Sequence, residues 1–160
     1  MARIPHTFTV ATVALLTSLG APAAASALVQ VDKGIAGARL GNTRGEVRAA
    51  LGTPARVISG MNPFGEFVEY RYRGGIRVLF QGRRRVSSVS TTGRGDRTAR
   101  NVGVGSREST VKARVKGVKC ETLGGVRSCH TGEFNPGEIV TDFMLRQGRV
   151  VRVTVGRVID

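Results

Sequence analysis

Apolar and polar residues alternate between Phe67 and Phe80, in two short runs that are separated by Arg73, Gly74 and Gly75. Alternation of this kind predicts a pair of strands, because successive side chains of a strand point to opposite faces. With the three central residues as a loop that has glycine in the left-handed conformation, three apolar pairs face each other: Tyr72 with Ile76, Tyr70 with Val78, and Val68 with Phe80. One face of this hairpin is then wholly apolar, and we expect the rest of the chain to be organised around it.

The opposite face of the same hairpin carries a pair of like charges. The register that closes the apolar face also sets Arg71 directly against Arg77. Like charges in this position lower the stability of a sheet, so folding alone does not account for them. We interpret Arg71 and Arg77, with Arg73 in the loop, as part of a surface that is kept positive for an anionic partner.

Upstream of the hairpin, the sequence predicts a short helix of about nine residues. Thr43 and Glu46 have capping-box spacing, in which each side chain accepts a hydrogen bond from the other residue's backbone N–H. Three apolar residues fall on one helix face: Val47, Ala50 and Leu51. Gly52 can take the left-handed position at the end of the helix, and Pro54 prevents continuation. A helix this short requires packing against a sheet.

Two more strands are expected on either side of the hairpin. Residues Arg56 to Ser59 form a candidate first strand, and a turn follows at Asn62-Pro63-Phe64-Gly65. After the hairpin, a strand is expected from about Arg85 to Thr92. Val86 and Val89 have opposite parity in that strand, so its register stays open and a bulge is plausible.

Residues 93–102 are polar, basic and glycine-containing, and they show no hydrophobic period. We interpret them as a linker between a first half, residues 28–92, and a second half, residues 103–160. The second half repeats the order of the first. The interval from Gly105 to Val111 equals that from Gly41 to Val47, which predicts a second helix over about 106–116, with Ser106 as its cap.

The two cysteines lie on either side of a predicted two-residue turn at Gly124-Gly125. Counting outward from the turn places Cys120 directly opposite Cys129. Alternation makes theirs a pair without backbone hydrogen bonds, in which the two backbones approach most closely, so we expect a disulfide. The alternative is a metal site that also uses His130, and it lacks further ligands at suitable spacing.

A second hairpin is expected after Asn135-Pro136-Gly137-Glu138. If residues 146–148 form a three-residue loop, three pairs close a further apolar face: Phe143 with Val151, Thr141 with Val153, and Ile139 with Val155. On the other face, Asp142 would oppose Arg152. This predicted opposite-charge pair contrasts with the like charges of the first hairpin, and it is the reason that we single out the first hairpin as functional.

Residues 1–27 read as a secretory signal peptide. They contain Arg3, an apolar run from Phe8 to Leu19 and a small-residue cleavage signal that ends near Ala27. No cysteine follows at once, so no lipid anchor is expected there. The apolar run is too short to span a membrane. We therefore expect a secreted, periplasmic or cell-envelope protein of roughly 133 residues, which suits a single domain.

The net charge of the chain indicates which classes of partner it can bind. The whole sequence carries a formal net charge of +14, and loss of the leader would remove only Arg3 from that charge. A charge this large on a small domain favours an anionic polymer or an acidic protein surface. The alternative is that the basic residues only solubilise edges and turns. Aromatic residues make up 5% of the chain, too few for a stacking platform, so nucleic acid is an unlikely partner.

No catalytic motif stands out. His130 is the one histidine after the leader, and we expect it to be a strand residue and not a base. Glu66 and Glu69 lie on opposite strand faces by period, which is a poor arrangement for an acid and base pair. Both cysteines are assigned to the disulfide, and neither G-x-S-x-G nor H-E-x-x-H occurs. We therefore expect no enzymatic activity and no cofactor.

Three weaker binding signals are less favoured than their structural alternatives. Oxygen-bearing side chains that could gather around calcium lack EF-hand spacing: Glu133, Asn135, Glu138 and Asp142. Arg94-Gly95-Asp96 is the integrin-recognition tripeptide, which arises often by chance in a chain rich in arginine and glycine. Gly103-Val104-Gly105 could hold one anion before a helix, and an ordinary lead-in to that helix is favoured instead.

The segment Gly41-Asn-Thr43-Arg-Gly-Glu46-Val47-Arg-Ala-Ala-Leu51-Gly52-Thr-Pro54 resembles the G-x-T-x-x-x-V-x-x-x-L-G-x-P signature of the BamE/SmpA small-lipoprotein family. The predicted two-part arrangement is similar to β-lactamase-inhibitor-protein-like folds, in which two helix-plus-sheet repeats join into one curved sheet. This resemblance covers about fourteen residues closely and implies a fold. The sequence lacks the family's lipobox cysteine, which a lipoprotein role in outer-membrane assembly requires. No binding residues are carried over from either family.

Together these observations predict an α+β fold of two tandem repeats. Each repeat would have one short helix and about four antiparallel strands, in one curved sheet with both helices on one face. We expect a binding module whose free sheet face presents four arginines: Arg71, Arg73, Arg77 and Arg152. The rival hypotheses are a protein inhibitor of a secreted enzyme, which the resemblance suggests, and an envelope assembly factor that acts by strand addition.

Overall fold

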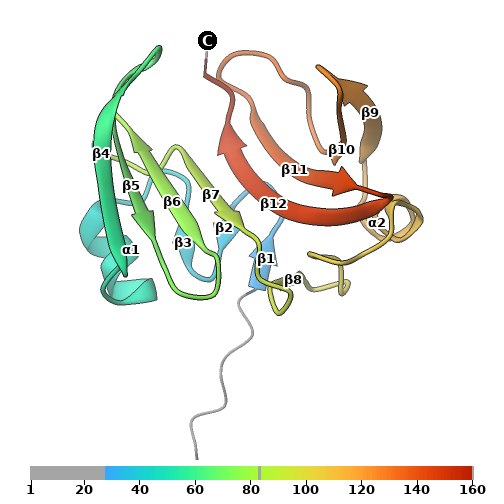
Figure 1. The fold of residues 1–160 in the computed structure, drawn as a ribbon, viewed down its shortest axis with the longest axis horizontal. Helices are drawn as coiled ribbons and strands as arrows, with labels where there is room; N and C mark the ends of the chain where they lie inside the picture. Colours follow the sequence, from blue (N-terminus) through green and yellow to red (C-terminus); the bar gives the residue numbers. More distant parts are fainter. Residues whose placement is uncertain (1–27, 83, 160) are drawn as a thin grey trace, which may run out of the picture.

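The computed structural model describes residues 28–82 and 84–159, so the predicted leader lies outside the described residues. Eight antiparallel strands form the large sheet, in the order β4-β5-β6-β7-β12-β11-β10-β9 (Figure 1). Their bounds are β4 Arg56–Asn62, β5 Gly65–Arg71, β6 Arg77–Gln81, β7 Ser88–Thr91, β9 Lys119–Leu123, β10 Val126–His130, β11 Ile139–Arg146 and β12 Arg149–Arg157. With the helices α1, Arg44–Leu51, and α2, Glu108–Arg114, this arrangement confirms the predicted α+β class.

A second, small sheet was not predicted. It has the order β3-β2-β1-β8, with β1 Leu28–Gln30, β2 Gly34–Ile35, β3 Ala38–Arg39 and β8 Arg97–Thr98. Strands this short show no hydrophobic period, which is why the sequence pattern missed them. The parallel pairing of β8 with β1 also gives structure to residues 93–102. That segment contributes Val102, whose side chain is fully buried.

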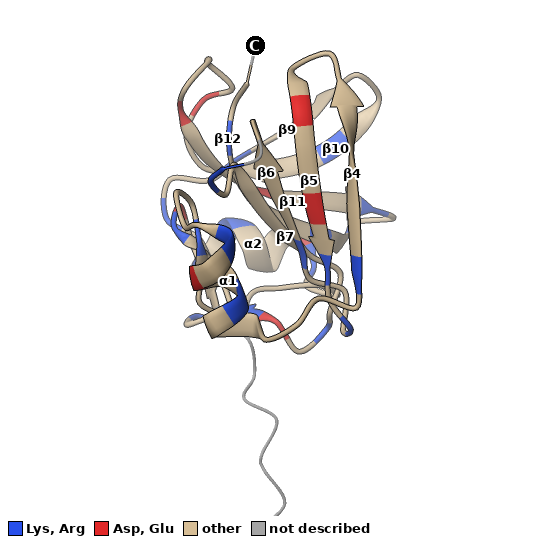
Figure 2. Ribbon diagram, turned by 90° about the vertical axis from the view of Figure 1, so that its left-hand side faces the viewer, with Lys and Arg blue, Asp and Glu red and all other residues tan. Residues whose placement is uncertain are grey.

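The core lies between the large sheet and a layer formed by the helices and the small sheet. We call the sheet face on this side the inner face and the opposite one the outer face. Val47 of α1, Val111 of α2 and Ile35 of β2 are buried in the same cluster as the inward residues of the strands. Both helices therefore cover one face of the sheet, and Figure 2 shows them on the same side of the strands.

Helix α1 forms as its sequence predicts. Thr43 Oγ1 accepts a hydrogen bond from the N–H of Glu46 at 3.3 Å, and a carboxylate oxygen of Glu46 accepts from the N–H of Thr43 at 2.7 Å. Gly52 caps the other end with φ of 77°. The helix buries Val47 completely and lays Arg48 over the ring of Tyr70, 5.3 Å from its centroid. The capping box and these contacts fix the helix against the first hairpin.

Helix α2 differs from its prediction. It spans Glu108–Arg114, and its N-cap is Arg107, with no side-chain capping bond. Ser106 does not cap it, because its hydroxyl accepts a hydrogen bond from the N–H of Gly103 at 3.1 Å. The serine thus stabilises the turn before the helix and not the helix itself.

The first hairpin has the predicted register. Val68 pairs with Phe80, Tyr70 with Val78, and Arg71 with Arg77. Tyr70 and Phe80 also meet edge to face on the inner side, with ring centroids 4.9 Å apart. The predicted turn before β5 is also confirmed, since Asn62 pairs with Gly65. Strand β4 extends through Asn62, past the expected end at Ser59.

The strand after the hairpin is shorter than expected. Val86 lies before it and not in it, which explains why Val86 and Val89 have opposite parity. Residues 88–91 pair with β6 and β12, but Val86 instead exchanges backbone hydrogen bonds with Gly41 and Asn42, ahead of α1. Ser87 lies at this break and bonds through its hydroxyl to Gln81 and Leu79 of the neighbouring strand β6. Val86 and Val89 can therefore both be buried.

The register predicted for the second hairpin is wrong by two residues. Phe143 pairs with Val153, Thr141 with Val155, and Ile139 with Arg157. The connection is a two-residue turn at Gln147-Gly148, both with positive φ, and a bulge lies next to it opposite Met144 and Leu145. A shift of two preserves parity for Val153 and Val155, so this part of the expected apolar face still forms. At the bulge, the buried Val150 takes the inward position in place of the expected Val151. Asp142 consequently pairs with Thr154 and Arg152 with Met144, and the predicted Asp142/Arg152 pair does not exist.

Matching hydrogen bonds occur at the start of each half. Arg85 donates from Nη1 to the carbonyl oxygen of Gly41 at 2.9 Å, and Arg149 donates in the same way to Gly105 at 3.0 Å. Backbone bridges also join Thr43 to Arg85 and Arg107 to Arg149. The two groups of strands meet at the centre of the large sheet, where β7 pairs with β12.

The disulfide between Cys120 and Cys129 is confirmed, with the two Cα atoms 3.9 Å apart. The register of β9 and β10 is the predicted one, from Leu123 with Val126 to Cys120 with Cys129. Gly124 and Gly125 both have positive φ, as a two-residue hairpin turn requires. Among the described residues, no helix is long and apolar enough to cross a membrane.

Candidate anion-binding surface

Three arginines lie side by side on the outer face of the large sheet. Arg56 of β4 is directly opposite Arg71 of β5, and Arg71 is directly opposite Arg77 of β6. Residues that face each other on adjacent strands have Cβ atoms about 5 Å apart. We call these three residues the arginine row. Figure 2 shows basic positions side by side at one end of β4 and β5.

One carboxylate lies within this surface. Glu69, two residues before Arg71 on the same strand face, forms an ion pair with the Arg71 guanidinium. The side chains of Arg71 and Glu69 are 39% and 20% exposed. Within the described part of the chain, no carboxylate pairs with Arg56 or Arg77. Glu69 therefore neutralises one charge of the row and leaves a net positive surface.

The other two predicted binding residues lie apart from the row. Arg73 is in the loop between β5 and β6, where it lines a cavity of about 470 Å³ together with Tyr72 and Ile76. Arg152 is on the outer face of β12, opposite Met144 and two strands from Arg77. The structure thus brings Arg71 and Arg77 together and leaves Arg73 and Arg152 outside the row.

Sequence analysis missed Arg56. The signal that would have found it is the turn at Asn62 to Gly65. Counting back from the Asn62/Gly65 pair along two antiparallel strands places residue 56 opposite residue 71. The predicted strand ends at Ser59, short of the turn, and so it does not place Arg56 opposite Arg71.

His130 occupies a buried position and is not presented to a substrate. Its ring is 1% exposed, its Nδ1 lies 3.1 Å from the carbonyl oxygen of Gly132, and its Nε2 lies 2.8 Å from a carboxylate oxygen of Glu121. Phe134 covers the imidazole, with ring centroids 4.5 Å apart. These contacts use both ring nitrogens and favour a structural role.

Asp142 lies near His130 on the outer face, where β11 is partly covered. Its Oδ1 is buried and has no hydrogen-bond partner. Burial raises the pKa of the Asp142 carboxyl, while a hydrogen bond from Ser128 and the nearby His130 and Arg152 oppose the rise. The cavity of about 280 Å³ beside it is lined by residues that include Phe134, Thr154 and Arg157.

The calcium hypothesis gains no support from the arrangement of its residues. Glu138 accepts hydrogen bonds from the N–H of Glu133 and from Asn135 Nδ2, both at 3.1 Å, so it closes its own turn. Glu133 forms an ion pair with Lys119. The described residues contain one group with ligand-like spacing, Glu108 with Cys120 and Cys129, and both of its sulfur atoms belong to the disulfide.

The remaining two motifs are engaged in the fold. The carboxylate of Asp96 accepts a hydrogen bond from the Thr91 hydroxyl, and Asp96 is 8% exposed. The Arg94-Gly95-Asp96 tripeptide therefore does not present its acidic residue to solvent. At Gly103-Val104-Gly105, both glycine N–H groups are used, by Ser106 Oγ and by the carbonyl of Val150. No pair of free amides is available there for an anion.

No family model matches the chain, and no curated protein sequence matches it either. Solved structures with a similar arrangement include an extracellular protein containing a SCP domain from Bacillus anthracis, with a TM-score of 0.49, 11% identity and 74% of this chain covered. The chain spans 44% of that protein's length.

Two further solved structures are matched over a larger share of their own length. The DUF4309 family protein YjgB from Bacillus subtilis has a TM-score of 0.46 and 19% identity, with 72% of this chain and 78% of that one covered. The uncharacterized protein yfeY from Escherichia coli has a TM-score of 0.48 and 16% identity, with 79% and 95% covered. At these values, the comparisons identify no family for the chain.

Proposed function

We propose that this protein is an exported, non-enzymatic binding module whose outer sheet face takes an anionic partner, either an acidic polymer of the cell envelope or an acidic protein. The observation that carries the proposal is the direct alignment of Arg56, Arg71 and Arg77 on three adjacent strands. Like charges placed in this way lower the stability of a sheet. The best explanation for the three arginines is therefore that they contribute to the affinity for a partner.

The disulfide supports the exported part of the proposal. Disulfides persist in oxidising environments such as the periplasm and the extracellular medium, and Cys120 and Cys129 are joined here. The predicted leader over residues 1–27 favours the same location. Immunodetection of the protein in salt-washed cell fractions would test this location. Retention of the uncleaved chain in the cytoplasm would contradict export.

The row suits an extended polyanion better than a small anion. The three guanidinium groups lie on a partly open sheet face, and repeated negative charges along a polymer can engage them one after another. Binding should then release counterions and weaken steeply with salt. A small anion would contact one or two arginines and would compete poorly with buffer ions.

The test uses poly-L-glutamate as the polyanion and measures the dissociation constant at several salt concentrations. The variant Arg56→Gln/Arg77→Gln removes the two row members that have no carboxylate partner and leaves the Arg71/Glu69 pair intact. We expect at least a tenfold loss of affinity in low salt and a shallower dependence on salt, by about one unit of slope for each lost contact.

The matched control is Arg84→Gln/Arg146→Gln, which removes the same charge at two exposed positions outside the row. This control should bind within about twofold of the wild type. If both double variants lose affinity equally, total charge and not the row determines binding, and the proposal fails. Circular dichroism and thermal unfolding of each variant would confirm that the fold is retained.

Strand β4 favours a second candidate function, an envelope assembly factor that acts by strand addition. Among the described strands it pairs only with β5, which leaves its other edge open there. Two large apolar residues on it, Val57 and Met61, are at least half exposed, and so is Phe64 in the turn that follows. An extended peptide could pair with such an edge. Replacement of Ser59 by proline should abolish capture of a partner peptide by this edge, and unchanged capture would exclude it.

We also infer that the two halves form a tandem repeat, related to the BamE/SmpA and β-lactamase-inhibitor-protein-like arrangement. The matching bonds from Arg85 to Gly41 and from Arg149 to Gly105 support this relationship. If the halves are equivalent, Arg85→Leu and Arg149→Leu should lower the free energy of unfolding by similar amounts. A loss confined to one of them would argue against the repeat.

A further inference from the structure

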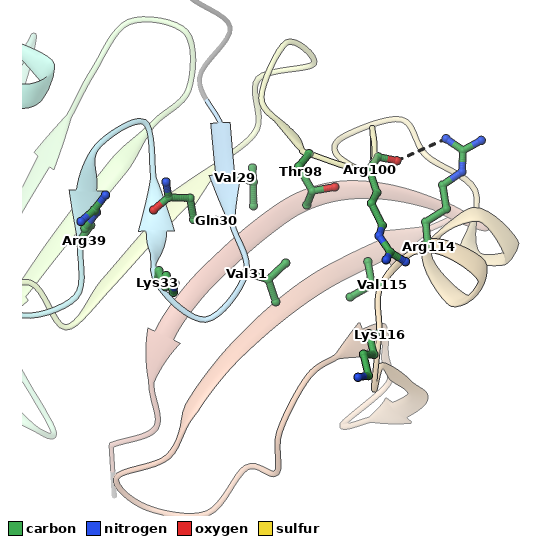
Figure 3. Close-up of a pocket in the computed structure, with 11 residues that line it drawn as sticks. Val29, Gln30, Val31, Lys33, Arg39, Thr98, Arg100, Arg114, Val115 and Lys116 are labelled. Carbon is green, nitrogen blue, oxygen red and sulfur yellow. Dashed lines mark hydrogen bonds between the residues drawn. The ribbon is translucent and has the colours of Figure 1, made fainter.

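A basic cavity of about 530 Å³ lies between the small sheet and the C-terminal end of α2 (Figure 3). Its walls come from β1 and the turn after it, from β3, from the loop after β8, and from the last turn of α2. These elements belong to both halves of the chain. The volume is in the range of small-molecule sites, which measure about 300 to 1,000 Å³.

All charged side chains that line this cavity are basic. They are Lys33, Arg39, Arg100, Arg114 and Lys116. Figure 3 shows Lys33 and Arg39 on one side of Val31, and Arg100, Arg114 and Lys116 on the other. None of the five forms an ion pair among the described residues. We call these five residues the basic rim.

The nearest carboxylate along the chain is turned away from the rim. Asp32 lies between Val31 and Lys33, but its Oδ1 accepts hydrogen bonds from the hydroxyls of Thr131 at 2.6 Å and Thr141 at 2.8 Å. This arrangement ties the turn after β1 to the second half of the chain. Asp32 therefore does not offset the positive charge of the rim.

The floor of the cavity is apolar. Val29 and Val115 are 2% and 7% exposed, and Val31 lies between the two groups of basic side chains in Figure 3. Thr98 adds a hydroxyl at the edge. Arg114 is held toward Arg100, since its Nη1 donates to the Arg100 carbonyl oxygen at 3.4 Å. A ligand in this cavity would meet valine side chains below and cationic groups above.

We propose that this cavity binds a small amphipathic anion, with a phosphate or carboxylate head at the basic rim and a short apolar body over the valine floor. An inorganic anion would use only the basic rim and would leave the valine floor uncovered. No aromatic residue lines the cavity, so it offers no ring on which a nucleobase could stack.

This site is separate from the arginine row, which lies on the outer face of the large sheet. The cavity lies on the inner side, among the small sheet and α2. The two proposals can therefore fail independently. Loss of the row should leave the cavity functional, and loss of the rim should leave binding of the polyanion intact.

Titration calorimetry with inorganic phosphate and with ethyl, butyl and hexyl phosphate tests the proposal, at concentrations at which none of these forms micelles. We expect the affinity to rise with chain length, by at most about fourfold for each fully buried CH₂, and then to level off when the floor is covered. Equal affinity for inorganic and hexyl phosphate would overturn the amphipathic assignment.

The variant Lys33→Gln/Lys116→Gln removes charge from opposite sides of the cavity, and neither side chain makes a hydrogen bond to another described residue. It should weaken hexyl phosphate binding at least tenfold. The controls Arg84→Gln/Arg146→Gln and Arg56→Gln/Arg77→Gln remove the same charge elsewhere and should change this affinity less than twofold. Equal losses in all three would overturn the site.

A floor variant separates the apolar contribution from the charge. Val31→Thr keeps the shape of the side chain and replaces one methyl group with a hydroxyl. It should flatten the dependence on chain length and leave the affinity for inorganic phosphate unchanged. If the chain-length dependence persists in this variant and in Val115→Thr, the apolar body does not bind on the floor, and the proposal is overturned.

Discussion

Arg127 of β10 and Glu108 in the first turn of α2 form a bidentate ion pair, in which Arg127 Nε lies 3.2 Å from Glu108 Oε2 and Nη2 bonds to Oε1. Lys112, one turn further along α2, bonds to the same carboxylate at 2.9 Å. Helix α2 lacks a side-chain cap, and these contacts stabilise its first turn and join it to the sheet. The hydrogen bond from Arg127 is the main cause that lowers the pKa of Glu108 to about 2.

Glu108→Gln should therefore destabilise the protein in a pH-dependent way. A depressed pKa contributes stability that is fully present above the unfolded-state pKa of about 4.5 and is lost as the pH falls through about 2. With screening by solvent, we expect a loss of about 1 kcal/mol at pH 7 and none below pH 2. Urea unfolding at pH 7, 4 and 2 measures the difference. If the difference in unfolding free energy between the wild type and the variant stays constant over this range, the carboxylate charge does not cause the loss of stability.

Asp142→Asn should stabilise the protein at neutral pH. Burial raises the pKa of Asp142, so the folded state binds the proton more tightly than the unfolded state does. The associated stability is present below the unfolded pKa of about 3.8 and is lost as the pH rises through the folded pKa. Asparagine is neutral at every pH, and we expect a gain of about 1 kcal/mol at pH 7. Thermal unfolding should show no gain at pH 3, and destabilisation at pH 7 would contradict the reasoning.

Gln147→Asn should raise stability at all pH values. Gln147 has φ of 52° and Gly148 has φ of 69°, which a two-residue hairpin turn requires at both positions. Asparagine adopts the left-handed region more readily than glutamine does, so we expect a gain of about 0.5 kcal/mol. Gly148→Ala at the adjacent position should have the opposite effect. Chemical denaturation measures both changes, and a loss in the Asn variant would show that the glutamine side chain contributes elsewhere.

Arg77→Thr should separate stability from binding. The substitution removes one member of a directly opposed like-charge pair and replaces it with a residue that favours strands. We expect a gain of about 0.3 kcal/mol in the free energy of unfolding, with weaker binding to poly-L-glutamate. Arg152→Thr, also on the outer face but opposite Met144, is the control and should gain less. If Arg77→Thr loses stability, the opposed arginines are not a burden on the fold.

Local patterns predicted much of the first half and the cysteine hairpin of the second half correctly. The capping box at Thr43, the three-residue loop after Tyr72 and the two-glycine turn at Gly124-Gly125 each depend on neighbouring residues only. The corresponding register, from Val68/Phe80 to Arg71/Arg77, follows once the loop is known. These features were accessible because the backbone conformation and the residue types at the turn agree.

The errors came from features that depend on distant contacts. Gln147 is an uncommon residue for a left-handed turn position, so the second hairpin was assigned a longer loop and the wrong partners. Ser106 has the residue type of a helix cap but bonds to Gly103. The basic cavity combines residues from β1, β3 and α2, whose proximity no periodicity indicates. Of the candidate surface, Arg71 and Arg77 were predicted, and Arg56 required the full length of β4.

The pairing of β7 with β12 has a consequence for how the protein unfolds. The strands β4 to β7 and the strands β9 to β12 meet at this pair. Separating the two groups would leave an unpaired edge on each and would expose Val89 and Val155, which are buried there. The small sheet adds a second link, since β8 follows the first half and pairs with the N-terminal β1. Neither half is then a self-sufficient folding unit, and the molecule should melt in one cooperative step, with equal calorimetric and van't Hoff enthalpies.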